Sequence, residues 1–384
     1  MDDPQTHRGG RYQTQPSGYR AFIPASLPPH PPVRIEGELQ SLLSKADHTL
    51  GRLDGSVVTL PNPDLFVFMY VRKEAVLSSQ IEGTQSSLQD LLAAEADILG
   101  SERPRDVAEV INYVAAMRHG LARLAGLPVS VRLIKEIHAE LMKGARGGKL
   151  TPGEIRRSQN WIGPSGSTLN TAAFVPPPHL DVPDLLGNLE TFVHEADDLP
   201  FLIKVGMAHA QFETIHPFLD GNGRVGRLLI TFLLTERNVL QKPVLYLSHY
   251  LKRHRSAYYE HLQAIRDRGD WEGWLAFFLK GVIEVGIEAA ETARRILALR
   301  ESHRTAITDH LGRASGNGHR VLETLFNRPI VSIADVQQVT RTTHAAANAL
   351  VSRLVALGIL VEMTGFARNR RYRYERYVNL FTNE

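Results

Sequence analysis

The residues best suited to chemistry lie in one run, from 216 to 227, which reads His-Pro-Phe-Leu-Asp-Gly-Asn-Gly-Arg-Val-Gly-Arg. The run offers a histidine that can act as a base near neutral pH, a carboxylate, a turn bracketed by glycines, and two arginines. A glycine turn lets backbone N–H groups face an anion, because no Cβ stands in the way. If the turn also opens a helix, the helix dipole adds positive potential at the same place. This combination predicts a site for a nucleoside triphosphate.

Helices are expected on both sides of the run, because apolar residues recur there at helical spacing. Upstream these residues are Leu202, Ile203, Gly206, Met207 and Ala210; downstream they are Val225, Leu228, Leu229, Phe232 and Leu233. The run is therefore expected to form an anion-binding loop between two helices. Arg224 and Arg227 fall three residues apart in the first turn of the second helix, so they project from neighbouring parts of one face. Phe218 is expected to anchor the loop in the core.

The run resembles the signature of the Fic (Fido) family, His-x-Phe-x-Asp/Glu-Gly-Asn-Gly-Arg-x-x-Arg, and all eight specified positions match. The resemblance implies transfer of AMP from ATP to a Ser, Thr or Tyr hydroxyl of a protein. It implies that His216 takes the proton from that hydroxyl and that Asp220 holds Mg²⁺ against the phosphates. The nucleotide-binding residues that it implies are Gly221, Asn222, Gly223, Arg224, Val225, Gly226 and Arg227.

The chemistry of this reaction suits the residues independently. Attack on an α-phosphorus needs a base near neutral pKa, and the leaving pyrophosphate needs neutralisation by a cation and paired arginines. One aspartate is sufficient for Mg²⁺, which binds one or two carboxylates together with phosphate oxygens. The alternative is a plain turn between helices, but such a turn needs neither a histidine nor two spaced arginines.

A second segment, Ser78 to Gly83, lies in a helical stretch expected to run from about Leu65. Ser78 and Glu82 are four residues apart and therefore share one helical face. The segment resembles the family's inhibitory motif, Ser/Thr-x-x-x-Glu-Gly/Asn, which implies that Glu82 pairs with Arg227 and prevents productive binding of the γ-phosphate. A carboxylate on a guanidinium competes with phosphate for the same donors. The alternative is an ordinary exposed glutamate at a helix end.

A third segment, residues 153–163 leading into 174–178, predicts a hairpin with a long connection. It resembles the family's flap, whose edge is thought to register the target by strand addition, so that main-chain bonds place the hydroxyl. The alternative is a surface loop that only connects two helices. The flap residues expected to touch the nucleotide are Ile162, Gly163, Phe174 and Val175.

A pair of tyrosines, Tyr258 and Tyr259, lies near the start of a predicted helix. In relatives a tyrosine pair at this position packs on the adenine, and aromatic stacking on a base is physically reasonable. The alternative is that the pair only packs between helices. Arg266 stands where some relatives carry an asparagine that touches the nucleotide, which leaves that contact open.

Composition excludes several classes of protein. The chain has 384 residues and no cysteine, so disulfides and thiolate chemistry are excluded. No apolar run approaches membrane-spanning length, and no apolar segment follows the initial Met-Asp-Asp-Pro as in a secretory signal, so no membrane partner and a cytoplasmic location are expected. The net charge of +3 is too small to indicate a partner by itself.

The expected fold is mainly α, with a Fic-type helical core, a small β-hairpin flap and a C-terminal winged helix-turn-helix domain. Four segments are expected along the chain. They are a mobile N-terminal segment over 1–34, a helical domain with the inhibitory helix over 35–125, a Fic catalytic core over 126–290, and a linker helix with the winged-helix domain over 291–384.

The winged-helix prediction rests on the order of elements after Ser332: a short helix, a Thr-Arg-Thr-Thr turn, a second helix to Leu357, and a pair of strands. Four arginines lie between 368 and 373. Residues 330–376 are therefore a candidate surface for nucleic acid, with phosphate or base contacts expected from Arg341, Thr343, His344 and Asn348. The alternative is a winged helix used for protein contacts or dimerisation.

Two functions from different classes are left open. The first is an autoinhibited protein adenylyltransferase that uses ATP and Mg²⁺, modifies a protein target and itself, and by resemblance forms a homodimer. The second is a DNA-binding regulator whose Fic-like core senses a nucleotide. The intact signature favours the first, because a sensor does not need His216. Within the enzyme class, Glu82 could instead position a water for removal of AMP.

Overall fold

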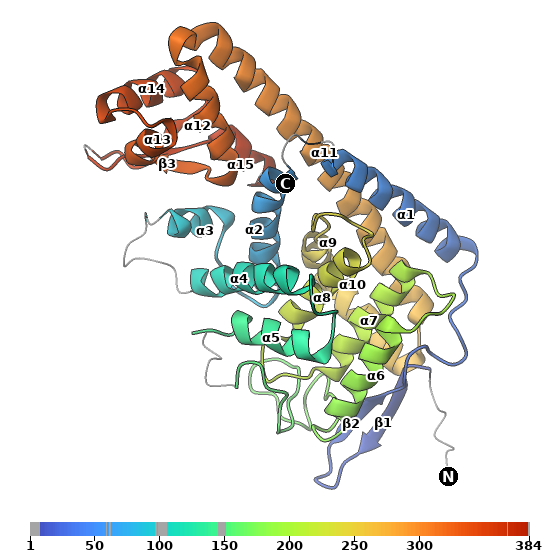
Figure 1. The fold of residues 1–384 in the computed structure, drawn as a ribbon. Helices are drawn as coiled ribbons and strands as arrows, with labels where there is room; N and C mark the ends of the chain where they lie inside the picture. The colour runs from blue at the N-terminus through green and yellow to red at the C-terminus, as the bar shows by residue number, and fades with distance from the viewer. Residues whose placement is uncertain are drawn as a thin grey trace.

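The protein is described from a computed structural model that covers residues 8–58, 60, 63–96, 98, 106–144, 151–366 and 368–382. It is mainly helical, as predicted, and two long helices run side by side along one flank (Figure 1). These are α1 (Gly37–Val58) and the 41-residue α11 (Trp271–Leu311). Within the described residues, no helix combines the length and the apolar character that crossing a membrane requires.

Two adjacent helices at the centre of the fold, α7 (Phe201–Ile215) and α8 (Asn222–Glu236), carry the candidate loop between them. Every residue of α7 from Leu202 to Ile215 is buried, because the helix is surrounded on all sides by other elements. Helix α7 is packed against α8, α6 (Val182–His194), α11 and α1. Helices α4 (Val107–Arg123) and α5 (Val131–Leu141) pack on α8, and α9 (Ser248–Arg253) and α10 (Arg255–Arg268) pack on α11. A loop held by two such buried helices has a fixed position.

The N-terminal segment differs from the prediction that residues 1–34 are mobile. Strands β1 (Gly10–Thr14) and β2 (Arg20–Pro24) form an antiparallel hairpin in which Tyr12 pairs with Phe22. Ala21 and Phe22 are completely buried, and the backbone N–H of Phe22 donates to the carbonyl of Val175 (3.0 Å). The polar average composition concealed these few apolar residues, which are enough to dock a hairpin on an existing core. Residues 1–7 lie outside the described residues.

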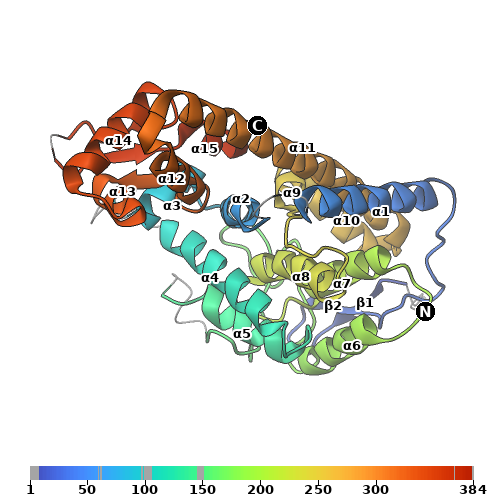
Figure 2. The same cartoon turned by 45° about the horizontal axis from the view of Figure 1, so that its top comes forward.

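Helix α2 (Pro63–Ile81) connects the core with the C-terminal elements (Figures 1 and 2). It packs on α4 and α9 on the core side and on α12 (Ser315–Asn327) and α15 (Glu375–Thr382) of the C-terminal unit. The rings of Tyr70 and Phe381 meet edge to face at 5.5 Å, and Arg72 forms a two-pronged ion pair with Glu95 of α3 (Leu88–Glu95). The helix that ends beside the candidate site is thus fixed along its length.

The C-terminal unit, residues 312–382, begins with a short 3₁₀ turn (Gly312–Ala314) and α12. It continues with β3 (Ile330–Ser332), α13 (Ile333–Thr340), α14 (His344–Ala356), β4 (Val361–Glu362) and β5 (Arg371–Arg373). The strands form an antiparallel sheet in the order β3-β5-β4. The two helices and the β4–β5 pair lie where the sequence predicts them, whereas β3 and α15 were not predicted. The assignment of this unit as a winged helix stays a prediction.

Candidate active site

The loop between α7 and α8 is shaped by two residues in the left-handed region. His216 ends α7 with φ 51°, and Gly221 precedes α8 with φ 78°. Between them, Phe218 is completely buried, and its ring stacks on the imidazole of His138 at 3.7 Å. The side chain of Asn222 closes the loop, because its Oδ1 accepts from the N–H of Phe218 and its Nδ2 donates to the carbonyl of Phe218, both at 2.8 Å. The side chain of Asn222 thus holds the loop, and its expected contact with a nucleotide stays a prediction for the backbone N–H.

Asp220 projects from this loop toward solvent. Its side chain is 49% exposed, and Oδ1 accepts from the N–H of Gly221 (2.6 Å). The backbone carbonyl of Asp220 is held by Nε2 of His138 (3.1 Å), whose Nδ1 accepts from the N–H of Gly153 (2.8 Å). Burial lowers the pKa of His138 to about 4, so this ring is neutral and fixes the loop as a hydrogen-bond bridge. His138 was not predicted from the sequence.

An exposed carboxylate beside a backbone turn suits a Mg²⁺ ion that takes its other ligands from phosphates and water. Among the described residues there is no group of three or more metal-binding side chains. The carboxylate of Asp220 therefore fits as one ligand of an ion that a bound nucleotide would bring.

The two arginines of the run are both buried and both engaged. Nη1 of Arg224 donates to Glu109 of α4 (3.1 Å), and its Nη2 lies 3.7 Å from Asp220. Arg227 donates from Nε to the hydroxyl of Ser78 (2.8 Å) and from Nη2 to the carbonyl of Ser78 (3.0 Å). The same Nη2 lies 2.6 Å from Oε1 of Glu82. Glu109 was missed in the sequence because α4 shows no motif around it.

The Glu82 carboxylate is placed at the entrance to this cluster. Glu82 follows α2, and Gly83 turns the chain away with φ 101°. Burial alone would raise the pKa of Glu82, but the charge and hydrogen bond of Arg227 outweigh it, so the pKa lies below its ordinary value. A Cβ at Gly223 would lie 2.3 Å from Oε1 of Glu82. The absence of a side chain at Gly223 is thus what allows the carboxylate to approach the first turn of α8.

His216 lies among cations. Burial lowers its pKa to about 4, and the nearby charges of Arg156 and Arg266 act in the same direction. Its Nδ1 is buried and has no hydrogen-bond partner among the described residues. The imidazole is therefore neutral near neutral pH, which is the form that accepts a proton.

Arg156 was not predicted as a site residue, although it lies in the predicted flap segment. It is 2% exposed, and among the described residues the partners of its guanidinium are all backbone carbonyls. Nε donates to His216 (3.0 Å), Nη1 to Ser158 (3.2 Å), and Nη2 to Pro177 (2.5 Å). One buried cation thus joins the end of α7 to both arms of the flap.

The flap forms as predicted at its narrowest point, where Ile162 and Phe174 exchange both backbone hydrogen bonds (2.8 and 3.0 Å). Ile162 and Gly163 are exposed and lie free for a ligand or a target. Phe174 and Val175 are buried, and the guanidinium of Arg266 stacks 3.5 Å from the centre of the Phe174 ring. Phe174 and Val175 were expected to touch a nucleotide, but the structure uses them to seat the flap.

The tyrosine pair likewise consists of one buried and one exposed residue. Tyr258 is 1% exposed, and its hydroxyl shares a hydrogen bond with Nε2 of His209 (2.9 Å), whose Nδ1 bonds the carbonyl of Gly226 (2.9 Å). Tyr258 is therefore a packing residue between α7, α8 and α10. Tyr259 is 43% exposed and lies beside it at 5.1 Å between rings. Of the two, only Tyr259 is open to an adenine.

Comparison with known proteins agrees with this geometry. Residues 40–122 match the Fic/DOC family N-terminal model, and residues 128–234 match the Fic/DOC family model. The fold is similar to that of a Fic family protein from Desulfovibrio desulfuricans, with a TM-score of 0.59 and 20% identity, over 89% of this chain and 97% of that one. The helical fold and the site loop thus define a Fic-type protein. Residues 40–122 and 128–234 are thus Fic/DOC family domains.

Two curated relatives are similar over part of the chain. A probable protein adenylyltransferase of Aquifex aeolicus is 32% identical over 181 residues, which is 46% of this chain and 51% of that protein. Protein adenylyltransferase Fic of Aedes aegypti is 29% identical over 201 residues, which is 50% of this chain and 35% of that protein. The match thus spans about half the length of the first relative and about a third of the second.

Proposed function

We propose that the chain is a protein adenylyltransferase, which transfers AMP from ATP to a hydroxyl side chain of a protein and is held inactive by Glu82. The observation that carries this proposal is the ion pair between Glu82 and Arg227, whose Oε1 and Nη2 atoms lie 2.6 Å apart beside the His216 loop. The names of the relatives from Aquifex aeolicus and Aedes aegypti support the reaction type. The matched family models and the intact signature support the same site.

The reaction assigns a role to each part of the loop. The N–H groups at the start of α8 and the guanidinium groups of Arg224 and Arg227 bind the phosphates of ATP. The hydroxyl oxygen of the target attacks the α-phosphorus, the bond to the bridging oxygen breaks, and pyrophosphate leaves. The hydroxyl proton passes to the neutral imidazole of His216. Mg²⁺ beside Asp220 supplies charge neutralisation for the phosphates when it is bound.

Inhibition follows from competition for one guanidinium. Ser78 occupies two donors of Arg227, and Glu82 shares one of the same nitrogens. A γ-phosphate that binds Arg227 must displace the carboxylate, because otherwise two anions compete for the donors of one guanidinium. ATP then binds without the geometry that attack on its α-phosphorus requires.

The test is the intact mass of wild type, Glu82→Gly and Glu82→Gly with His216→Ala after incubation with ATP and Mg²⁺, with CTP, GTP and UTP in parallel. We expect self-modification by the mass of AMP, larger in Glu82→Gly than in wild type and absent from the double variant. Equal labelling of wild type and Glu82→Gly would contradict inhibition by Glu82. Labelling that persists without His216 would contradict the assignment of the base.

A second activity at the same site is removal of AMP. The carboxylate of Glu82 is one-third exposed beside His216, where it can accept a proton from an attacking water. Incubation of AMP-labelled Glu82→Gly protein with wild type or with Glu82→Gly separates the two activities. Release of AMP only by the protein that retains Glu82 would establish hydrolysis. If neither protein releases AMP, Glu82 does not support hydrolysis, and inhibition is its only proposed role.

A further inference from the structure

The exposed face of the C-terminal unit is a basic surface around a helix-turn-helix. Helix α13 ends at Thr340, and Arg341 turns the chain in the left-handed region with φ 54°. Thr343 caps α14 by accepting from the N–H of Ala346 (3.3 Å). Two helices joined by so short a turn project the second helix, which has 13 residues and is therefore about 20 Å long, from the body of the unit.

The outward face of α14 carries small side chains. Its buried positions repeat at helical spacing and hold the helix on the unit: Ala347, Leu350, Val351 and Leu354. From the start of the helix to Arg353, the exposed positions are His344, Ala345, Ala346, Ala349, Ser352 and Arg353. A face of alanines and serine has little apolar area to bury against a protein, but it lets the helix backbone enter a groove. The major groove of a duplex admits one α-helix, and alanine contacts the methyl group of thymine.

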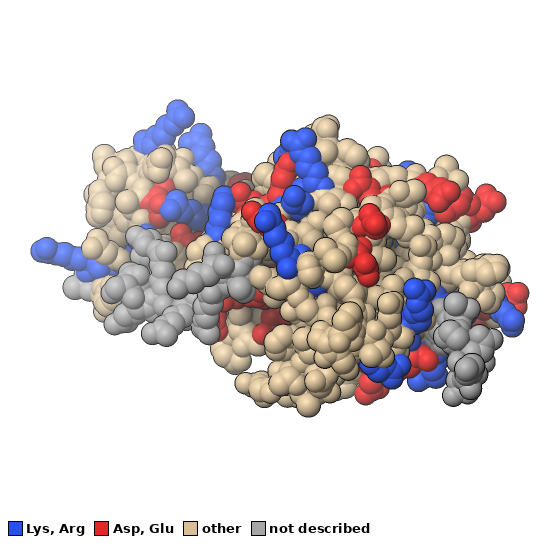
Figure 3. Space-filling view, turned by 90° about the horizontal axis from the view of Figure 1, so that it is seen from below, with Lys and Arg blue, Asp and Glu red and all other residues tan. Residues whose placement is uncertain are grey.

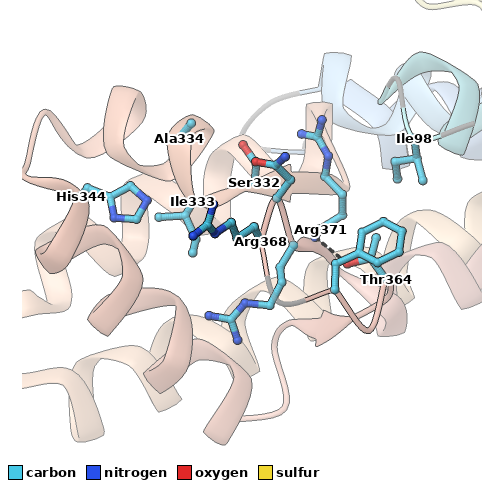
Figure 4. A pocket seen from close by; sticks show the side chains of 11 residues that line it. Ile98, Ser332, Ile333, Ala334, His344, Thr364, Arg368 and Arg371 are labelled. Carbon is cyan, nitrogen blue, oxygen red and sulfur yellow. Dashed lines mark hydrogen bonds between the residues drawn. The ribbon is translucent and has the colours of Figure 1, made fainter. Parts of the chain in front are cut away.

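The β4–β5 hairpin with its connecting turn, residues 361–373, is called the wing here and places arginines beside α14. A hollow of about 510 Å³ lies between the start of α13, the start of α14 and the turn that links β4 to β5, with Ser332, His344, Thr364, Arg368, Arg370 and Arg371 among its lining residues. Figure 4 shows Ser332, His344 and Arg368 around it. Arg370 donates to the side-chain oxygen of Asn348 on α14 (3.4 Å), so the wing is tied to the helix.

The charges of this unit are not balanced internally. Residues 312–384 contain ten arginines, no lysine and five acidic residues, whereas the whole chain has a net charge of only +3. The excess of cations is therefore confined to this unit. On the face seen in Figure 3, Lys and Arg side chains protrude at the end of the molecule that holds the unit in Figure 1.

Each carboxylate among the described residues of the unit already forms an ion pair or a hydrogen bond within the protein. Asp335 pairs with Arg328 (2.8 Å) and lies 3.7 Å from Arg371, and Glu362 accepts from the backbone and hydroxyl of Thr364 inside the wing. The remaining two, Glu323 and Glu375, pair with Arg300 and Arg373. Arg341 and Arg368, by contrast, are exposed and have no ion-pair partner within the described part of the chain.

From this arrangement we propose that residues 330–376 bind double-stranded DNA, with α14 in the major groove and Arg341, Arg368 and Arg370 on the phosphates. Of the arginines that form no ion pair within the described residues, Arg341 and Arg368 flank the helix, one in the turn before it and one in the turn between β4 and β5. Phosphate contacts fix the position of a helix in the groove, and contacts from its exposed face to the bases add a preference for particular DNA sequences. The inference is independent of the AMP-transfer reaction, because none of these residues belongs to the active site.

The test is fluorescence anisotropy of the full chain with a labelled DNA duplex of about 25 base pairs, long enough for two turns. We expect binding at low salt that weakens steeply as salt rises. The double variant Arg341→Ala with Arg368→Ala should weaken binding more than tenfold and reduce the salt slope by roughly one for each phosphate that is no longer neutralised. Arg52→Ala, which removes an exposed arginine from α1, is the matched control and should bind as wild type does.

Each outcome decides the proposal. Absence of binding at low salt, or equal weakening by Arg52→Ala, would overturn it. Equal competition by polyglutamate would also overturn it, because the surface would then attract any polyanion or an acidic protein. Thermal melting of each variant separates weaker phosphate binding from an unfolded unit. Self-labelling with ATP in the same preparations reports the active site separately.

Discussion

The guanidinium of Arg156 holds the backbone carbonyl of His216, with 3.0 Å between Nε and the oxygen. This bond lies at the carboxyl end of α7, where helix carbonyls lack partners inside the helix and the dipole is negative. His216 is also held in the left-handed conformation, which a non-glycine residue adopts only when its surroundings require it. Arg156 is therefore a positioning residue for the imidazole and the flap together.

Replacement of Arg156 by Met is expected to lower kcat for self-labelling by roughly 100-fold in a Glu82→Gly background, because small displacements of reacting groups are costly. The adjacent Arg157 is the matched control, since its side chain is 87% exposed and pairs only with Glu154. Arg157→Met should retain activity. Kinetics and melting temperatures are measured for both, and an active Arg156→Met would refute the positioning role.

The pH dependence of the reaction tests the cations around His216. The base must be neutral, so the rate falls when pH drops through its pKa, which lies at about 4 and not at the ordinary 6.5. We expect the acidic limb of kcat/KM to lie below pH 6 in Glu82→Gly. Removal of the Arg156 charge should move that limb to higher pH, because a cation no longer opposes protonation. A limb near 6.5 that Arg156→Met does not move would contradict this account.

Glu74 of α2 should make stability fall as pH rises. It is 2% exposed, and Oε1 accepts from Tyr113 (3.0 Å) and Ser248 (2.5 Å). Burial raises its pKa to about 7 from an unfolded value of 4.5. Between these values the folded state binds the proton and the unfolded state does not, so the free energy of unfolding decreases from pH 4.5 to 7.

Glu74→Gln removes this titration while keeping an acceptor for both hydroxyls. The melting temperature of the variant relative to wild type is therefore expected to increase between pH 5 and 8. Thermal melts at matched ionic strength measure the difference. A constant difference across this range would mean that Glu74 is charged, or neutral, in both states throughout.

The N-terminal hairpin should support the flap. Phe22→Ala removes a fully buried ring that lies 6.4 Å from the ring of Phe174, and we expect a loss of about 3 kcal/mol in the free energy of unfolding. Amide hydrogen exchange should quicken at Ile162 and Phe174, whose mutual bonds close the flap. Gln13→Ala, on the exposed side of the same hairpin, is the control. Unchanged exchange at these two amides would separate the hairpin from the flap.

Features that depend on residues close together in the chain could be predicted from the sequence. The loop and its helices follow from apolar periodicity on both sides of residues 216–227, and the pairing of Glu82 with Arg227 from a motif resemblance. The partners that arrive from distant elements could not be predicted. Glu109, His138 and Arg156 reach the loop from α4, α5 and the flap, and no spacing in the chain indicates that these meet. The packing of α4 and α5 on α8 brings in Glu109 and His138, and the hydrogen bonds of Arg156 to the carbonyls of His216 and Pro217 attach the flap.

The differences between the predicted and the observed surroundings of these residues have the same origin. Tyr258 and Phe174 carry side chains that can bind a nucleotide, and a sequence pattern cannot tell a ring that faces a ligand from one that faces the core. Asn222 was assigned to the nucleotide because it stands in the signature, yet the loop itself consumes both of its polar atoms. For residues 1–34, average composition concealed the two buried residues Ala21 and Phe22.

Helix α2 has a mechanical consequence. It is a single rod of 19 residues, and Tyr70, which meets Phe381 of the C-terminal unit, lies about 18 Å along the chain direction from Glu82. A helix bends little over such a length, so the contact of Tyr70 with Phe381 and the ion pair of Glu82 with Arg227 are held at a fixed separation by one stiff element. A displacement of the C-terminal unit that moved α2 as a rigid body would therefore also move the Glu82 carboxylate relative to Arg227.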